Sequence, residues 1–300
     1  MTAQTENATG AITAARDPAE PTRLRRFLRY LRRHPSVAVG GGLLLIMILI
    51  GVFAPLLWTV DPTAISPARR TRMPSEQYWF GTDMLGRDIY SRVVYGARVS
   101  LVVGFTVALL SSVVGLAIGL LSGFVRWADG IIMRAIDGMM SIPPILLAIA
   151  LMALTRGSVG NVIIAITLAE IPRVARLVRG VVLSLREQPY VEAAISNGAR
   201  VPRIIIKHIL PNTIAPMTVQ ATYICASAMI IEAILSFIGA GVPPATPSWG
   251  NIMAEGRALW QVRPHIVFFP ALFLSITVLA VNLLGDGLRD SLDPRLAKSI

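Results

Sequence analysis

Residues 189–211 read PYVEAAISNGARVPRIIIKHILP, and the prolines and the glycine of this segment mark two short helices joined by a turn. Pro189 and Pro202 each suit the first turn of a helix, where the missing backbone N–H of proline would have had no partner. Gly198 suits the left-handed position that follows the end of a helix. The sequence therefore predicts a bent pair of helices, the paired-helix segment, with its sharp turn at Gly198.

The first of these two helices has a face that carries very little side-chain bulk. Ala193 and Ala194, with Gly198 beyond them, would let a partner approach closely. Glu192 stands in the first turn, where a carboxylate suits the positive end of the helix dipole. Such a face is typical of a docking site for another protein.

Two other interpretations of the paired-helix segment are open. It could be a surface hairpin without a function, or a DNA-binding helix-turn-helix, because its flanks are basic and the spacing of Ala194 and Gly198 is plausible for that motif. Uncharged segments of about membrane-spanning length lie on both sides of it. We therefore expect a loop at a bilayer surface that binds a cytoplasmic protein partner and no nucleic acid.

The composition indicates a membrane protein. Of 300 residues, 54% are hydrophobic and only 15% are charged, and the mean hydropathy is +0.64, which is typical of a polytopic membrane protein. The net charge of +11 then serves mainly to orient the chain in the bilayer. The single cysteine, Cys225, lies in an apolar run and excludes an intrachain disulfide.

The uncharged runs predict an all-α polytopic membrane protein with six transmembrane helices. We predict a disordered basic cytoplasmic tail at 1–35, a first transmembrane helix at 36–60 and an extracytoplasmic segment with an interfacial helix at 61–98. A core of five helices follows at 99–289, and a cytoplasmic tail at 290–300. Both termini then face the cytoplasm. The segments assigned to that side carry most of the 28 Lys and Arg residues, as the positive-inside rule requires.

Two local patterns stand at the start of the core. The interfacial helix is predicted from about Leu85 onward, and Asp88 and Arg92, four residues apart, would form an ion pair on one side of it. In the second span, glycine recurs every fourth residue, at Gly115, Gly119 and Gly123. This stripe predicts a groove against which another helix packs closely.

Four residues are candidates for a translocation path or its gate. Pro143 and Pro144 would break the third span and leave backbone carbonyls without a helical partner. Within a bilayer such carbonyls occur only beside protein or a water-filled cavity. The alternative is a simple packing kink. Glu232 lies in the fifth span, where a charge costs about 3 kcal/mol, so it should make a structural hydrogen bond or contact substrate. Trp249, in a proline-rich outer loop, is either part of the gate or an aromatic anchor at the membrane interface.

The sequence has no motif that would make the chain an enzyme. A phosphate-binding P-loop and an H-E-x-x-H metal motif are absent, and the three histidines belong to no catalytic or metal-ligating pattern. We therefore expect no cofactor on this chain. Transport would be driven by a separate ATPase that binds ATP and Mg²⁺ and docks on the paired-helix segment, or by an ion gradient acting through Glu232 or Asp286, as in a secondary carrier.

Several motifs resemble those of ABC importer permeases. Glu192-Ala193-Ala194, Gly198 and Leu210-Pro211 resemble the EAA loop of these proteins, although His208 stands where the pattern usually has isoleucine. The signature of the dipeptide, oligopeptide and nickel branch is similar to GTDMLGRDIYSR at 81–92. Further similar segments are PRVARLVRG at 172–180, LSFIGAGVPPATPSWG at 235–250 and GDGLRDSLDPRL at 285–296. The resemblance extends over nearly the whole chain and is to the C-type subunit of this branch.

The resemblance implies a type I importer permease in a bacterial inner membrane, taking up di- or oligopeptides at the expense of ATP. Its expected partners are a B-type permease in a heterodimer, two cytoplasmic ATPases, an extracytoplasmic solute-binding protein and membrane lipid. The residues expected to couple to an ATPase are Glu192, Ala193, Ala194, Gly198, Arg200, Leu210 and Pro211. Glutathione-like peptides, nickel chelates and other small solutes remain open as cargo.

Overall fold

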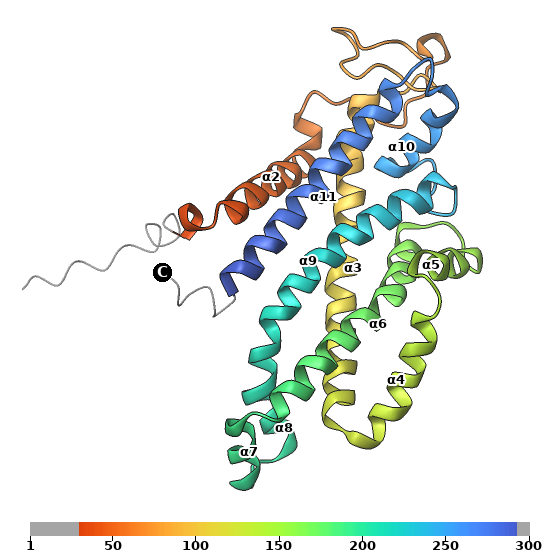
Figure 1. Cartoon of the computed structure of the whole chain (residues 1–300). Coiled ribbons are helices and arrows are strands. Elements are labelled where there is room, and N and C mark those ends of the chain that lie inside the picture. The colour runs from red at the N-terminus through yellow and green to blue at the C-terminus, as the bar shows by residue number, and fades with distance from the viewer. Residues whose placement is uncertain (1–29, 293–300) are drawn as a thin grey trace, which may run out of the picture.

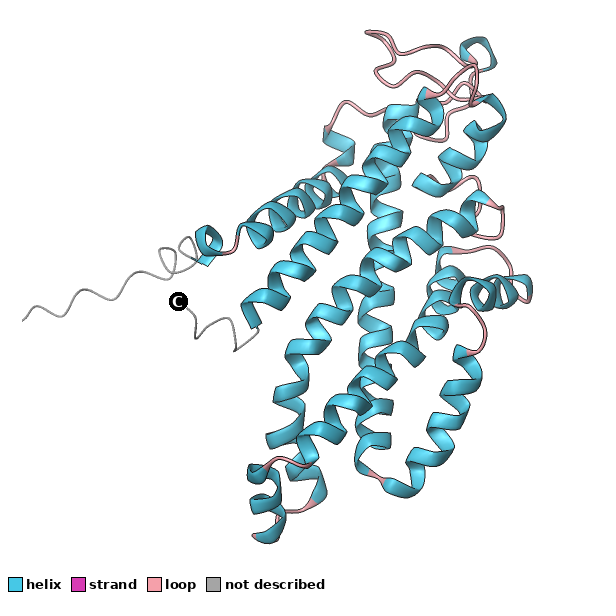
Figure 2. Cartoon of the chain, in the orientation of Figure 1, coloured by secondary structure: helices cyan, strands magenta, loops and turns pink. Residues whose placement is uncertain are grey.

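The computed structural model describes residues 30–292, which consist of helices and loops (Figure 2). Most of the two predicted tails therefore lies outside the described residues. The helices are α2 (Pro35–Val52), α3 (Ile89–Phe124), α4 (Arg126–Met140), α5 (Pro144–Ala153), α6 (Val159–Arg186), α7 (Pro189–Ser196), α8 (Val201–Ile204), α9 (Leu210–Phe237), α10 (Trp249–Gly256) and α11 (His265–Leu292). The long helices α3, α6, α9 and α11 form an elongated bundle, and α2 packs on its side against α11 (Figure 1).

Four helices are long and apolar enough to cross a membrane: α2, α3, the continuous run from α8 through α9, and α11. A fifth crossing is present if α4 and α5 are counted as one bent span. The remaining predicted span, the fourth along the chain, corresponds to α6, which has 28 residues but carries arginines through its second half. By length and composition the described residues thus contain four or five candidate spans, and the predicted count of six is not confirmed.

The chain between the first two long helices differs from the prediction. The first helix ends at Val52 rather than near residue 60, because a short 3-10 turn that contains Pro55 follows it. The helix predicted from about Leu85 begins at Ile89 and continues without a break into the second span, to Phe124. Asp88 is its N-cap and accepts a 2.8 Å hydrogen bond from the backbone N–H of Ser91. The loop before it leads directly into a membrane-length helix.

The predicted glycine groove is confirmed. A Cβ atom placed on Gly115, Gly119 or Gly123 would lie 2.5, 2.6 or 2.7 Å from the Cβ atoms of Val174, Val178 and Val182 respectively. These distances are too short for any side chain, so the backbone of α3 meets the valine row of α6 directly. The spacing of four in α3 matches the spacing of four in α6, which keeps the two helices in contact over several turns.

We expect Gly119→Leu to destabilise the protein by about 1–3 kcal/mol or more, because the added side chain would overpack the α3–α6 contact. Gly180→Leu is a matched control, since a Cβ there would meet nothing within 4 Å. Thermal unfolding of the purified variants in detergent measures the difference. Equal unfolding temperatures for the two variants would contradict the close packing.

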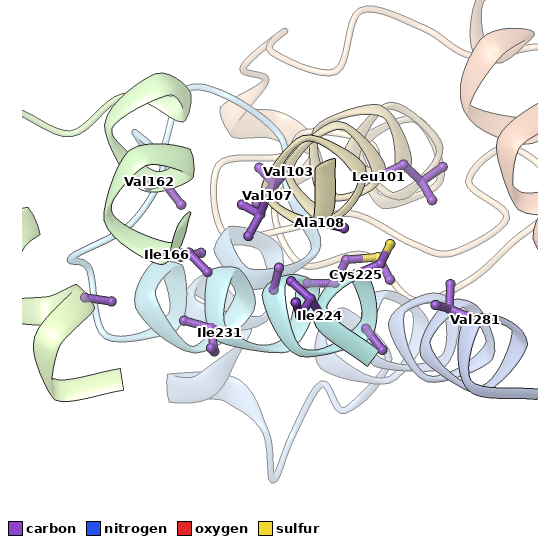
Figure 3. Close-up of a cluster of buried hydrophobic side chains, with 14 of the residues drawn as sticks. Leu101, Val103, Val107, Ala108, Val162, Ile166, Ile224, Cys225, Ile231 and Val281 are labelled. Atoms are coloured by element: carbon purple, nitrogen blue, oxygen red, sulfur yellow. The ribbon is translucent and has the colours of Figure 1, made fainter. Parts of the chain in front are cut away.

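Apolar side chains from four helices meet in the middle of the bundle (Figure 3). Val103 and Val107 of α3 lie close to Ile166 of α6 and Ile224 of α9, and all four are fully buried. Cys225 is also buried in this core. The core therefore joins α3, α6 and α9 into one unit along which movement at one end can reach the other.

The helix break predicted at the paired prolines is confirmed. Pro143 is the N-cap of α5 and Pro144 is its first residue, and α4 and α5 meet there at an angle of 85°. Asp129 of α4 accepts two hydrogen bonds from the Arg179 guanidinium of α6, at 2.5 and 2.7 Å, and Asp137 pairs with Arg176. α4 and α6 share few apolar contacts, so these ion pairs hold the two helices side by side.

Candidate functional site

The paired-helix segment forms the turn that the prolines and the glycine predict. Pro189 is the first residue of α7, and Pro202 lies in the first turn of α8. Between these helices Gly198 has a φ of +73°, and its N–H donates a 2.9 Å hydrogen bond to the carbonyl of Ile195. A Cβ on Gly198 would meet nothing within 4 Å. The turn thus requires a left-handed residue and stands open to its surroundings.

The segment presents its small face outward. Glu192, Ala193, Gly198 and Arg200 are exposed and Ala194 is half-buried. Glu192 stands in the first turn of α7. It forms no ion pair with any of residues 30–292. Four large apolar side chains of the segment are also exposed: Tyr190, Ile195, Val201 and Ile206. This combination of small, apolar and unpaired charged residues is suited to contact with another protein.

Two buried side chains tie the exposed segment to the bundle. Val191 of α7 is fully buried, and Ile204 of α8 is 2% exposed. Both belong to the hydrophobic core that contains the α6 and α9 side chains. The exposed segment is therefore anchored in the same core as α6 and α9.

A π-helical turn, Ile205–Ile209, joins α8 to α9, and the sequence did not predict it. The N–H of Leu210 bonds to the carbonyl of Ile205, five residues earlier. Pro211 has no N–H to offer the carbonyl of Lys207, which explains why regular helical bonding is interrupted here. Leu210 is half-buried and Pro211 exposed at the start of α9. His208 lies beside Tyr190, with ring centroids 6.2 Å apart.

The opposite end of the molecule contains a charged cluster that the sequence did not predict (Figure 1). It consists of Asp83, Arg87, Arg92 and Glu255. Asp83 is fully buried and accepts hydrogen bonds from Arg87 Nε at 2.7 Å and from Arg92 Nη1 at 2.5 Å. Arg92 and Arg87 both also pair with Glu255 of α10.

The charged cluster replaces the predicted pair of Asp88 and Arg92, which is wrong. Asp88 is used as the cap of α3, while Arg92 is turned inward and is only 1% exposed. Two arginines and two acidic residues balance each other, so their burial is compensated by ion pairs and hydrogen bonds. The cluster joins the loop before α3, the first turn of α3 and α10. The spacing of acidic and basic residues within 81–92 was the sequence signal for such a cluster. Glu255 could not have been assigned to the cluster from the sequence.

Trp249 and Glu232 lie at the same helix junction, where α10 packs on α3 and α9. Trp249 is fully buried and its Nε1 donates a 3.0 Å hydrogen bond to the carbonyl of Val93, so the interpretation as an interfacial anchor is wrong. Glu232 is also fully buried, and it accepts hydrogen bonds from Ser236 Oγ at 2.8 Å and from Ser100 Oγ at 3.3 Å.

The four candidate path residues form two separate groups. Pro143 and Pro144 lie at the α4–α5 break, and these helices pack on α6 rather than on α10. Glu232 and Trp249 lie beside α10 near the charged cluster. α9 connects this second group with the paired-helix segment, because it runs from Leu210 beside that segment to Phe237 near Glu232.

Comparison with known proteins supports the same view of the chain. Residues 113–298 match the family described as binding-protein-dependent transport system inner membrane component, and residues 22–74 match the N-terminal transmembrane domain of oligopeptide transport permease C. A probable peptide ABC transporter permease protein, y4tQ of Sinorhizobium fredii, is 52% identical over 95% of this chain and 98% of its own length.

Other relatives agree. The dipeptide transport system permease protein DppC of Alkalihalophilus pseudofirmus is 42% identical over 91% of this chain and 90% of its own length. The glutathione transport system permease protein GsiD of Salmonella typhimurium is 47% identical over 91% of this chain and 90% of its own length.

A solved structure of the inward-facing MetNI methionine ABC transporter is similar in fold, with a TM-score of 0.56 and 20% identity over 68% of this chain and 98% of that chain. The all-helical bundle, the family match and the close relatives lead to one conclusion. The chain belongs to the inner membrane components of binding-protein-dependent transport systems, as a permease of the ABC transporter class.

Proposed function

We propose that the chain is the C-type permease subunit of an ATP-driven importer of di- or oligopeptides. The observation that carries this proposal is the exposed, small-residue face of the paired-helix segment, anchored in the core of a chain that belongs to a permease family. The relatives' names, which refer to peptide, dipeptide and glutathione transport, support a peptide cargo. Nickel chelates and other small solutes are the alternative cargoes.

The proposed topology has six membrane crossings in a type I importer fold. In it, α2, α3, the bent pair α4–α5, α6, α9 and α11 each cross once. The length of α6, about 42 Å for 28 helical residues, supports a crossing. Its arginines lie toward the end that carries the paired-helix segment, where long side chains reach the headgroup region.

The proposed orientation puts both termini and the paired-helix segment in the cytoplasm of a bacterial cell. The turn between α3 and α4 lies at the same end of the bundle as α7 and α8 (Figure 1). Both regions are basic, which supports their assignment to the inside. The loop before α3 and α10 lie at the opposite end and would face the extracytoplasmic binding protein.

In the proposed mechanism, the paired-helix segment is the coupling helix of the transporter. Glu192 pairs with a basic residue of an ATPase, Ala193 and Ala194 allow close contact, and Gly198 keeps the bend. Arg200, Leu210 and Pro211 complete the coupling residues on the way into α9. ATP and Mg²⁺ are bound by the two ATPases, and the chain itself holds no cofactor.

Movement of the coupling helix reaches the other side of the membrane through α9. Closure of the ATPases moves α7 and α8 toward the corresponding helices of the B-type subunit. Because Val191 and Ile204 are buried in the core, α6 and α9 move with α7 and α8. The far end of α9 holds Glu232, whose bonds to Ser100 and Ser236 link α9 to α3. We propose that Glu232 and Trp249 belong to the gate at this end and that Pro143 and Pro144 border the path.

Glu192→Ala is expected to weaken recovery of the ATPases about tenfold, because it removes one partner of a partly desolvated ion pair worth on the order of 1.5 kcal/mol. The measurement is co-purification of the ATPases with the tagged chain, quantified by mass spectrometry. Glu76→Ala, at an exposed position of the outer loop, is the control and should leave recovery unchanged. Undiminished recovery with Glu192→Ala would reduce Glu192 to a residue that only stabilises its own helix.

The cargo is tested by transport into vesicles that contain the reconstituted importer and its binding protein. Competition between a labelled dipeptide, an oligopeptide, glutathione and a nickel chelate ranks the candidate substrates. Uptake of peptide that depends on ATP is the expected result. Selective uptake of the nickel chelate would retain the importer and overturn the peptide assignment.

A further inference from the structure

An apolar crevice of about 640 Å³ separates α2 from the upper part of α3. The side chains that line it are those of Ile48, Val52, Leu101, Val102, Phe105 and Thr106. Val102 and Val52 are more than half exposed, so the crevice opens outward. The N-terminal helix α2 packs mainly on α11, and this leaves its contact with α3 incomplete along the crevice.

Arg98 closes one end of the crevice. Its Nε donates a 2.5 Å hydrogen bond to the carbonyl of Gly51, and its Nη2 donates a 2.9 Å bond to the carbonyl of Val52. The guanidinium carbon lies 5.1 Å from the centroid of the Tyr95 ring. No carboxylate within residues 30–292 forms an ion pair with Arg98. Its positive charge is therefore met only by backbone dipoles and a ring face.

The position of Arg98 along the bundle corresponds to the edge of the hydrocarbon layer. It binds the last carbonyls of α2, an apolar helix of 18 residues whose length of about 27 Å is close to the thickness of that layer. The crevice extends from Arg98 toward the middle of the membrane. Lipid chains are the medium at that depth, and phosphate groups lie at the depth of Arg98 itself. A guanidinium at this depth can make charge-assisted hydrogen bonds to the phosphate of a lipid headgroup.

We propose that the α2–α3 crevice binds one acyl chain of an anionic phospholipid whose headgroup phosphate pairs with Arg98. The lipid completes the contact between the N-terminal helix and the permease core. The assignment of the site to the outer leaflet rests on the orientation proposed above. Lipid binding itself does not depend on import. Failure of the transport assignment and failure of the lipid site are therefore distinguishable.

The test uses the full purified chain in nanodiscs of phosphatidylethanolamine that contain a small fraction of phosphatidylglycerol with a photoreactive acyl chain. After illumination, mass spectrometry locates the labelled peptides. Labelling is expected on the residues of α2 and α3 that line the crevice. Arg98→Gln should lower the labelling of these residues roughly fivefold, because one basic residue contributes about 1 kcal/mol to the binding of an anionic lipid.

Arg257→Gln is the matched control. Arg257 also donates to a carbonyl at a helix end, that of Phe237, and lies 5.8 Å from an aromatic ring centroid, but it does not line the α2–α3 crevice. Crevice labelling in this variant should equal that of the unchanged chain. Val102→Trp fills the crevice without altering charge and should reduce labelling as strongly as Arg98→Gln does, which keeps the test decisive if Arg98→Gln does not fold.

Three results would overturn the proposal. The first is equal crevice labelling in the unchanged chain and in Arg98→Gln. The second is equal labelling by a photoreactive lipid with a zwitterionic choline headgroup. The third is crosslinking of a photoreactive residue at position 102 to the second permease, and not to lipid, in complexes taken directly from membranes.

Discussion

Gly198→Asp is expected to reduce recovery of the ATPases with the tagged chain by about 100-fold or more while membrane insertion stays normal. Aspartate tolerates a φ of +73° better than most residues, and the space around Gly198 is open, so the chain itself should fold. In the proposed complex, an ATPase would occupy the same space. An unpaired charge buried there costs on the order of 3–5 kcal/mol, which corresponds to the predicted loss of binding.

Gly239→Asp is a closely matched control for this experiment. Gly239 also has a positive φ, +83°, and a Cβ placed on it would likewise meet nothing within 4 Å, but it follows α9 at the opposite end of the molecule. It introduces the same charge in the same backbone conformation, and ATPase recovery should stay normal. Normal recovery and uptake with Gly198→Asp would count strongly against the coupling mechanism.

Arg92→Met is expected to destabilise the protein by about 3–5 kcal/mol, because it leaves Asp83 buried without one of its two cationic partners and weakens the bond to Glu255. The outer loop and α10 should then separate from the start of α3. The measurement is thermal unfolding of the purified chain, together with limited proteolysis of the loop before α3.

Arg72→Met controls for the loss of an arginine at the same end of the molecule, in the loop before α3. Arg72 is exposed and its side chain donates only a 3.3 Å hydrogen bond to the carbonyl of Ala68, so its replacement should change stability little. An Arg92→Met protein as stable and as resistant to protease as Arg72→Met would show that the charged cluster does not hold this end together.

Features that depend on neighbouring residues could be predicted from the sequence. Pro189, Pro202 and Gly198 specify the paired-helix segment through proline geometry and a left-handed turn, and the structure has both. The glycines of α3 are spaced four residues apart and therefore lie on one face of the helix, which predicted a close contact with another helix. The proline break between α4 and α5 followed from the missing N–H groups.

Features that depend on distant partners could not be predicted. Arg92 was expected to pair with Asp88 four residues away, but it pairs with Glu255, which lies 163 residues later. Trp249 was left between a gate residue and an interfacial anchor, and only the packing of α10 on α3 shows that it is buried. The crevice between α2 and α3 depends on how α2 leans against α11, for which the sequence has no local signal.

Family membership changes the weight of the three functional hypotheses. An ion-coupled carrier and a DNA-binding regulator both fitted the absence of a P-loop, whereas the match to a binding-protein-dependent permease family favours the importer alone. The buried Glu232 is compatible with this assignment, because Ser100 and Ser236 donate hydrogen bonds to it within the chain. Proton coupling through Glu232 is not needed to explain why an acid is retained in α9.

The central claim is that this permease is driven by ATPases bound to its paired-helix segment. Its most direct test is a pull-down of the tagged chain from membranes in mild detergent, with mass spectrometry of every protein that co-purifies. We predict a second permease, ATPase subunits and a solute-binding protein, with the ATPases lost in Gly198→Asp. Recovery of the chain alone, or as a homodimer without an ATPase, would contradict the claim.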